Sequence, residues 1–418
     1  MRHERTPVGC VASRPVRQLA WTSLVRVREL REVYFVDGLR TAFGRAGPQG
    51  VFWHTRGDDM AVKLVRELLR RNPSLPAERI DDVVFAATAQ VGDQGLTLGR
   101  DVGLLAGLPR SVPGFAVDRM CAGALTAITT GAGEIAMGAA DIVLAGGVEH
   151  MGRHPMLEDV DYNPRFLSER LIDPSAATMG QTAENLHDRF PQLTKEAADE
   201  YAVRSHHRLG EAWQDGVMRD TVVPMAVLTD EGWREADTDE FLRPDASVEA
   251  IRDLPTPFRP GGRVTAGNSA GLTDGATAAL LASDRSAEEL GLEPSLHLAA
   301  FAFAGVEPEL MGLGPVPATK KVLERAGLTI DEIDAFELNE PFAVQVLSWC
   351  DGVGVSPDDE RLNPYGGAIA CGHPLAATGA RLVAQLAHAI RERPSARYGL
   401  TALCVGMGMG AALLWERP

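Results

Sequence analysis

The 418-residue chain lacks a surplus of positive charge, a paired-cysteine pattern and any apolar run of transmembrane length. Its formal net charge of −16 provides no basic field to neutralise phosphates, which argues against a nucleic-acid-binding protein. The five cysteines are odd in number and scattered, without metal-type spacing. We therefore expect no disulfide framework, no metal site and a reducing, cytoplasmic location.

The composition is that of a globular protein, with 45% hydrophobic and 23% charged residues. A chain of this length exceeds one ordinary hydrophobic core, so more than one domain is expected. Residues 1–30 stand apart because they are rich in arginine and lack the continuous apolar segment of a secretory signal. Glu4 and Glu29 disfavour a transit peptide. We interpret this segment as a disordered tail or a mis-assigned start.

A faint internal repeat organises the rest of the chain. "RIDDVVFA" at 79–86 resembles "EIDAFELN" at 332–339, and an amphipathic helical stretch precedes each. Further back, "VYFVDGLRTAFGR" and "LHLAAFAFAGVEP" both indicate a buried strand that runs into a loop. The alternation of strands and helices predicts two α/β halves with mainly buried sheets.

The two copies differ by a long insertion. The last repeated pair, 275–283 and 408–416, requires extra residues in the first copy, between "GGVEHMG" and "TAGNSAG". This insert is rich in charge and proline, as a surface lid or loop domain would be. The predicted division is a first half of 31–150 plus 268–293, an inserted loop domain at 151–267, and a second half of 294–418.

Cys121, in "DRMCAGALTAI", is the candidate nucleophile, although a lone cysteine is more often a small core residue. It precedes a helix of small residues, and a helix N-terminus favours a thiolate. The repeat places Cys121 one residue from the equivalent of His373, in "GGAIACGHP". The two equivalent helix starts would face each other across a cleft, with His373 as the base that the thiol needs.

Three further positions have the chemistry of a carbonyl-transfer site. Cys404 ends an apolar strand, and two residues later Gly406 offers a backbone N–H as an oxyanion donor. Asn339, in "ELNEPFA", ends another strand, where its amide can hold a water or a carbonyl oxygen. Glu340 is either the orienter of Asn339 or an ordinary solvated carboxylate.

The blocks "DRMCAGALTAI", "NEPFA", "GGAIACGHPLAATGAR" and "CVGMGMGAA", in this order and spacing, resemble the signature blocks of thiolases. "GGVEHMGRHPM" is most similar to bacterial 3-ketoacyl-CoA thiolases of fatty-acid β-oxidation. The resemblance runs from about Arg31 to Pro418. It implies a duplicated α/β fold with a layered αβαβα core and an inserted loop domain.

The resemblance also implies roles. Cys121 would be acylated, and His373 would take the proton of Cys121 and later that of the CoA thiol. Cys404 would move the proton at the α-carbon of acetyl-CoA. His373 and a water on Asn339 would bind the enolate oxygen, and the backbone N–H groups of Cys121 and Gly406 would bind the tetrahedral intermediate.

Substrate contacts are implied by matching positions too. Ser269 is the hydroxyl near the expected CoA site, although the usual order of alanine then serine is reversed here. The acyl and pantetheine pocket would be lined by Met179, Met311 and Phe342, which could equally be ordinary core. Thr178 stands where short-chain relatives often have histidine, which favours a longer-chain enzyme.

The expected reaction is thiolytic cleavage of 3-ketoacyl-CoA by CoA to acetyl-CoA and a shortened acyl-CoA. Alternatives are a biosynthetic acetoacetyl-CoA thiolase and, with less support, a non-catalytic CoA- or lipid-binding protein. The resemblance implies CoA as a substrate with no cofactor and no metal. It further implies a homodimer or homotetramer, with a hydratase/dehydrogenase as a potential partner in a complex.

Overall fold

The computed structural model describes residues 30–158 and 160–418. Residues Arg31–Pro418 form one compact unit. The predicted tail at 1–30 lies, except for Leu30, outside the described residues. The division of the remainder into two halves and a loop domain stays a prediction. In the described ranges, no helix is both long and apolar enough to span a bilayer.

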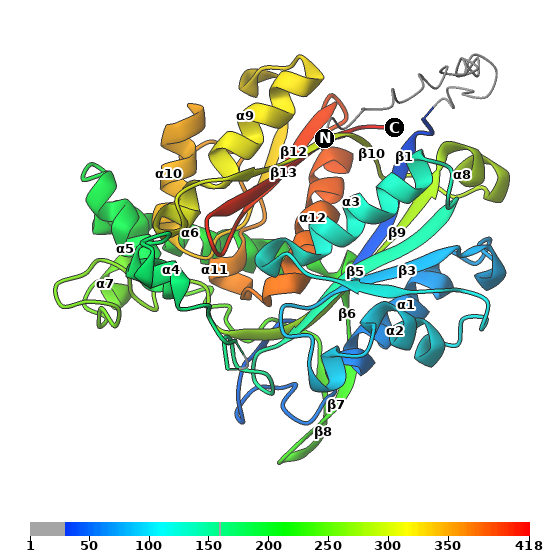
Figure 1. The fold of residues 1–418 in the computed structure, drawn as a ribbon, viewed down its shortest axis with the longest axis horizontal. Coiled ribbons are helices and arrows are strands. Elements are labelled where there is room, and N and C mark those ends of the chain that lie inside the picture. The colour runs from blue at the N-terminus through cyan, green and yellow to red at the C-terminus, as the bar shows by residue number, and fades with distance from the viewer. Residues whose placement is uncertain (1–29, 159) are drawn as a thin grey trace, which may run out of the picture. The chain divides into compact units, whose positions relative to one another are not determined.

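One mixed sheet runs through the unit, with the strand order β11-β12-β13-β10-β1-β9-β5-β3-β4 (Figure 1). The first repeat contributes β1 (Val33–Thr41), β3 (Asp82–Ala86), β4 (Phe115–Val117), β5 (Ile142–His150) and β9 (Thr273–Ser283). The second contributes β10 (Leu296–Gly305), β11 (Ala335–Leu338), β12 (Tyr398–Val405) and β13 (Met409–Glu416). The two groups join where Tyr34 and Phe35 of β1 pair antiparallel with His297 and Leu296 of β10.

The repeat predicted from the sequence is present in the order of the elements. Strand β1 corresponds to β10, helix α1 (Gly57–Arg71) to α9 (Pro315–Ala326), and β3 to β11. Strands β9 and β13 form the corresponding last pair. Each of β3 and β11 pairs parallel with a neighbour and follows an amphipathic helix, as the pattern of the two sequence copies predicts.

Helices cover and separate the two groups of strands. On the outer side of the first group lie α1 and α2 (Leu98–Ala106), and on that of the second lie α9 and α10 (Ala343–Val353). Helices α3 (Gly123–Ala136) and α12 (Thr378–Glu392) contact each other and pack between the two groups (Figure 1). The result is five alternating layers, and the expected α/β fold class is confirmed.

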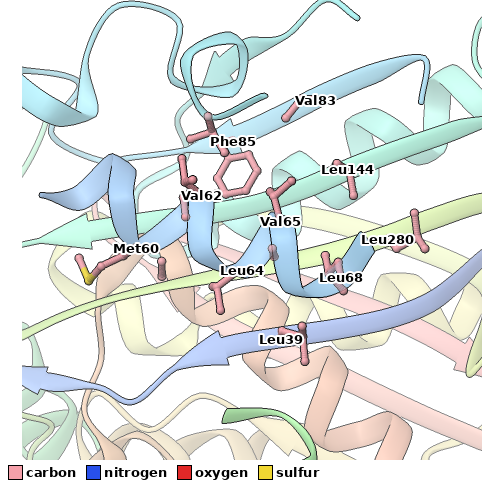
Figure 2. Packing of buried hydrophobic residues seen from close by; sticks show 14 of the residues in the cluster. Leu39, Met60, Val62, Leu64, Val65, Leu68, Val83, Phe85, Leu144 and Leu280 are labelled. Carbon is pink, nitrogen blue, oxygen red and sulfur yellow. The ribbon is translucent and has the colours of Figure 1, made fainter. Parts of the chain in front are cut away.

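Helix α1 shows why these layers form. Asp58 and Asp59 lie in its first turn and Arg70 and Arg71 in its last, as the helix dipole favours. Apolar residues recur at helical spacing and face the sheet, so that one stripe of the helix is buried. Figure 2 shows this stripe, with residues of α1 against side chains of β1, β3, β5 and β9: Leu39, Met60, Val62, Leu64, Val65, Leu68, Val83, Phe85, Leu144 and Leu280.

The predicted insert carries its own small elements. These are α4 (Arg165–Ser168), α5 (Met179–Arg189), α6 (Lys195–Gln214), α7 (Val248–Ile251), β6 (Val222–Val223), and the hairpin of β7 (Met225–Thr229) and β8 (Gly232–Ala236). It is tied closely to the rest, since β6 pairs with β1 and α6 contacts α10 and α11 (Ala368–Cys371). The remaining elements are β2 (Gly44–Arg45), which pairs with β9, and α8 (Asp284–Leu290).

Candidate active site

The two central helices approach closely because glycines stand at their contact. A Cβ on Gly123, the first residue of α3, would lie 2.8 Å from the methyl groups of Ala86 and Ala376. A Cβ on Gly379 in α12 would lie 2.6 Å from the backbone nitrogen of Leu125. These distances are too short for any side chain. The small residues beside Cys121 and His373 therefore let the two repeat-related helix starts meet.

A central cavity of about 80 Å³ lies at this meeting point. It is lined by Cys121, His373 and Cys404, so three of the four predicted catalytic side chains share one cavity. The structure brings Asn339 to the same place but behind it: its Nδ2 lies 3.3 Å from Nε2 of His373, and it does not line the cavity. Met179, Met311 and Phe342, predicted to line the substrate pocket, line this cavity as well.

Cys121 lies in a 3₁₀ turn, Met120–Ala122, directly before α3. Burial raises the pKa of its thiol to about 11, while the backbone N–H groups of Gly406 and of Cys121 itself oppose the rise. Desolvation outweighs these two donors, so Cys121 is a thiol at rest and needs a base to take its proton. The predicted oxyanion donors nevertheless both act on this sulfur.

His373 lies between α11 and the 3₁₀ turn Leu375–Ala377, where two threonines hold it. Its backbone N–H donates to Oγ1 of Thr273 at 2.9 Å, and its Nδ1 lies 2.6 Å from Oγ1 of Thr378. Burial, followed by the nearby charge of Arg381, lowers the pKa of the ring to about 3. His373 is therefore a neutral imidazole at rest, able to accept a proton.

Cys404 is the penultimate residue of β12, near the strand end where the sequence predicted it, and is fully buried beside Cys121. Burial, with a smaller effect from Cys121, raises the pKa of its thiol well above the ordinary value. It is thus a neutral thiol that carries a proton. Cys350 and Cys371, both also buried, do not line the central cavity.

Glu340 is neither of the two alternatives that the sequence left open. It is fully buried, and its carboxylate accepts hydrogen bonds from Tyr201 (2.7 Å), Ser205 (2.6 Å), Asn363 (2.7 Å) and the backbone N–H of Ile369 (3.2 Å). Through these bonds Glu340 ties α6 and α11 to the segment that holds Asn339. It is a structural anchor of the site.

Two residues beside the oxyanion donors have left-handed backbone conformations. Met120 has φ of 45° and Met407 has φ of 61°, although neither is glycine. Such conformations cost about 1–3 kcal/mol and persist only where the surrounding fold enforces them. Each directly adjoins a predicted donor, Cys121 in one case and Gly406 in the other.

Two larger cavities adjoin the central one. The methionine cavity, of about 260 Å³, contains Met120 and Met407 and shares with the central cavity the residues Cys121, Met151, Met156, Met179 and Leu375. The arginine cavity, of about 590 Å³, contains Arg45 and Arg243 and shares Ala270, Gly271 and Leu272. The central cavity thus shares walls with both of the larger cavities.

Ser269, the predicted CoA contact, lies in the arginine cavity, but its hydroxyl donates to the carbonyl of Thr265 at 2.8 Å. Sequence reasoning missed Thr273 and Thr378, the hydroxyls that hold His373. Thr378 could have been suspected, since it stands at the start of the helix that follows His373. Thr273 is distant in sequence and gave no signal.

Comparison with known proteins agrees with the geometry. The chain matches the family models "Thiolase, N-terminal domain" over residues 33–285 and "Thiolase, C-terminal domain" over 292–417. It is 41% identical to a 3-oxoadipyl-CoA/3-oxo-5,6-dehydrosuberyl-CoA thiolase of Escherichia coli K12, and 41% identical to a 3-ketoacyl-CoA thiolase of Enterobacter sp. strain 638. Both alignments cover 93% of this chain and all of the relative.

Solved structures give the same result. Human mitochondrial 3-ketoacyl-CoA thiolase superimposes with a TM-score of 0.84 at 31% identity, over 94% of this chain and all of that one. Acetyl-CoA acetyltransferase of Bacillus anthracis does so with a TM-score of 0.83 at 32% identity, over 93% of this chain and all of that one. The chain therefore belongs to the thiolase family, whose enzymes are acyltransferases.

Proposed function

We propose that this protein cleaves 3-ketoacyl-CoA thiolytically, with CoA, to acetyl-CoA and an acyl-CoA shortened by two carbons. The observation that carries the proposal is the convergence of Cys121, His373 and Cys404 in one buried cavity. Breaking a carbon–carbon bond beside a ketone requires a covalent acceptor, an enolate stabiliser and a proton donor. The cavity offers a side chain suited to each.

In the first half-reaction, the sulfur of Cys121 attacks the 3-keto carbon while Nε2 of His373 takes the thiol proton. A concerted transfer is favoured because both groups are neutral at rest, with pKa values of about 11 and about 3. The new alkoxide accepts hydrogen bonds from the backbone N–H groups of Cys121 and Gly406. One such donor is worth roughly a hundredfold in rate or more.

The bond between C2 and C3 then breaks, leaving the acyl group on Cys121 and the enolate of acetyl-CoA. The protonated His373 donates to the enolate oxygen, together with a water held by Asn339. The Oδ1 atom of Asn339 is buried without a partner among the described residues, a situation in which amides commonly bind water. Cys404 protonates C2, for which its high thiol pKa suits it.

Before the second half-reaction, the proton on His373 passes to the thiolate of Cys404 in the shared cavity, so that both groups are neutral again. His373 then takes the proton of the incoming CoA thiol, the CoA sulfur displaces Cys121 from the acyl group, and His373 returns the proton to the released Cys121 thiolate. The adjoining cavities suggest how CoA lies. Arg45 and Arg243 in the arginine cavity offer positive charge for its phosphates, and the turn Ala270–Leu272 leads to the central cavity. Ser269 lies on this route, with its hydroxyl already used by the backbone.

The methionine cavity supports a substrate longer than acetoacetyl-CoA. A cavity of about 150 Å³ can hold a benzene molecule, and this one measures about 260 Å³. Its position beside Cys121 suits the acyl chain that becomes attached to the sulfur. These features favour a degradative role in fatty-acid β-oxidation over condensation of two acetyl-CoA molecules. The unused space would serve no purpose for an acetyl group.

The proposal includes CoA as a substrate, with no prosthetic group. A cytoplasmic location fits the thiols of Cys121, Cys350, Cys371 and Cys404, all free in the structure. A homodimer or homotetramer, and a complex with a hydratase/dehydrogenase, remain part of the proposal by analogy with the family.

The test is the intact mass of the protein after exposure to 3-oxohexanoyl-CoA or acetoacetyl-CoA without free CoA. We expect the mass of a butyryl group to be added by the first, in wild type and in the control Cys350→Ala, but not in Cys121→Ala. Adding CoA should remove the label. Labelling by acetoacetyl-CoA alone would favour the biosynthetic alternative. No labelling by either would refute the proposal in favour of a CoA-binding protein.

A further inference from the structure

The similarity to known proteins does not decide which acyl chains the enzyme accepts. A relative named for substrates that end in a carboxylate and one named for 3-ketoacyl-CoA are both 41% identical to this chain. The 3-oxoadipyl group differs from the 3-oxohexanoyl group only in carrying a terminal carboxylate in place of a methyl group. The residues around the far end of the acyl chain must therefore distinguish these substrates.

The methionine cavity is largely apolar. Its walls carry methyl, thioether and aliphatic groups that suit a hydrocarbon chain and adapt to its shape. The residues that provide them are Met120, Met151, Met156, Met179, Leu375 and Val160. An uncharged chain would bury apolar surface against these walls without losing any strong interaction with water.

The charged groups of this cavity are of the wrong kind for a carboxylate. Asp118, Glu149 and Glu158 line it, and no lysine or arginine does so anywhere in the described part of the chain. The carboxylate of Glu149 already accepts hydrogen bonds from the backbone N–H groups of Thr88 and Ala376, both at 3.1 Å. Whatever the protonation of these acids, none supplies positive charge.

The remaining polar groups do not compensate. His154 is the one basic side chain that lines the cavity in the described ranges, and its Nε2 lies 2.5 Å from Oδ1 of Asp93. The guanidinium of Arg119, a close neighbour in sequence, stacks on Phe303 at 3.6 Å from the ring centre and does not line the cavity. Apart from His154, which is already paired with Asp93, a terminal carboxylate would meet uncharged donors such as Gln90, with acidic groups beside them.

We infer that this enzyme is selective for 3-ketoacyl-CoA with uncharged acyl chains and discriminates against chains that end in a carboxylate. This inference rests on the proposed function and specifies its substrate class. A carboxylate moved from water into an apolar cavity without a cation loses hydration that nothing there replaces. We expect kcat/KM for 3-oxoadipyl-CoA to be at least about 100-fold lower than for 3-oxohexanoyl-CoA.

The experiment measures kcat/KM for both substrates with saturating CoA, in wild type, Glu158→Lys and Glu293→Lys. Glu158 is exposed at the cavity, whereas Glu293 is exposed on the turn before β10 and lines none of the three cavities. Both changes alter the net charge equally. The selectivity ratio is kcat/KM for 3-oxohexanoyl-CoA divided by kcat/KM for 3-oxoadipyl-CoA. It should fall about tenfold or more in Glu158→Lys and stay at the wild-type level in Glu293→Lys.

The outcomes separate the two proposals. If the enzyme cleaves 3-oxohexanoyl-CoA, and kcat/KM for 3-oxoadipyl-CoA lies within threefold of that for 3-oxohexanoyl-CoA, the selectivity is refuted. The proposed function is then still supported. If the ratio fell equally in both lysine variants, the change would be an effect of net charge. The methionine cavity would then not determine the selectivity. Failure to cleave either substrate would refute the proposed function, and the selectivity with it.

Discussion

Replacing Thr378 by valine tests how the imidazole of His373 is oriented. The Oγ1 atom of Thr378 lies 2.6 Å from Nδ1 of His373 and 3.4 Å from the carbonyl of Pro374. If Nδ1–H donates to Thr378, and the hydroxyl donates to Pro374, Nε2 carries the lone pair that can accept the proton of Cys121, with Nδ2 of Asn339 3.3 Å from it. The hydroxyl would thus select the tautomer that acts as a base.

The magnitude follows from the burial of the pair, with Thr378 fully buried and His373 6% exposed. An unpaired buried donor costs about 1–3 kcal/mol, and a hydrogen bond to a charged partner is worth about 1.5–3 kcal/mol. The imidazolium formed during attack has such a bond, and Thr378→Val would remove it. We therefore expect kcat/KM to fall about 10- to 100-fold, since about 1.4 kcal/mol corresponds to a factor of ten.

The assay is steady-state thiolysis of 3-oxohexanoyl-CoA, with acylation of Cys121 followed separately by intact mass. Thr378→Ser is the matched control, because it keeps the hydroxyl and loses the methyl group, whereas valine keeps the shape and loses the hydroxyl. Serine should retain at least a third of the activity. If serine impaired the enzyme more than valine, or valine stayed within twofold of wild type, Thr378 would act through packing and the reasoning would fail.

Three further predictions concern other parts of the site. Because burial raises the pKa of Cys121 to about 11, its alkylation by iodoacetamide should accelerate about tenfold per pH unit between pH 6 and pH 9, as measured by peptide mass. A rate independent of pH would instead reveal a resting ion pair between the Cys121 thiolate and the His373 imidazolium. Glu340→Gln should lower the free energy of unfolding in urea by about 2 kcal/mol or more, because the new NH₂ group faces hydrogen-bond donors, and an unchanged midpoint would contradict its role as an anchor. Gly123→Ala should destabilise by about 1–3 kcal/mol and reduce activity, since its methyl group meets Ala86 and Ala376, whereas Gly133→Ala in the same helix meets no atom within 4 Å and should stabilise slightly.

The main outline of the fold could be predicted because the duplication is written into local patterns. Apolar spacing marks α1 and α9, short apolar runs mark β3 and β11, and their common order fixes the topology. The register of the repeat also predicted that Cys121 and His373 stand at equivalent helix starts, and both line the central cavity. Patterns of this kind can be recognised from the sequence alone because each depends on residues that are close together in the chain.

Features that depend on residues far apart in the chain could not be predicted. Glu340 meets Tyr201 and Ser205 of α6, more than a hundred residues away, and its two sequence interpretations both missed this burial. The desolvation that raises the pKa of the Cys121 thiol also depends on surroundings that the local sequence does not show. The composition of the methionine cavity likewise depends on loops from several segments.

The left-handed conformations of Met120 and Met407 have a consequence for engineering the protein. A search guided by thermal tolerance alone would favour glycine or asparagine at these positions, since either residue adopts a positive φ more readily. The same exchange would let the adjoining N–H groups of Cys121 and Gly406 swing more freely. Selection for thermal stability and selection for catalytic turnover would then favour different residues at these two positions. A library of variants should therefore be scored for both properties.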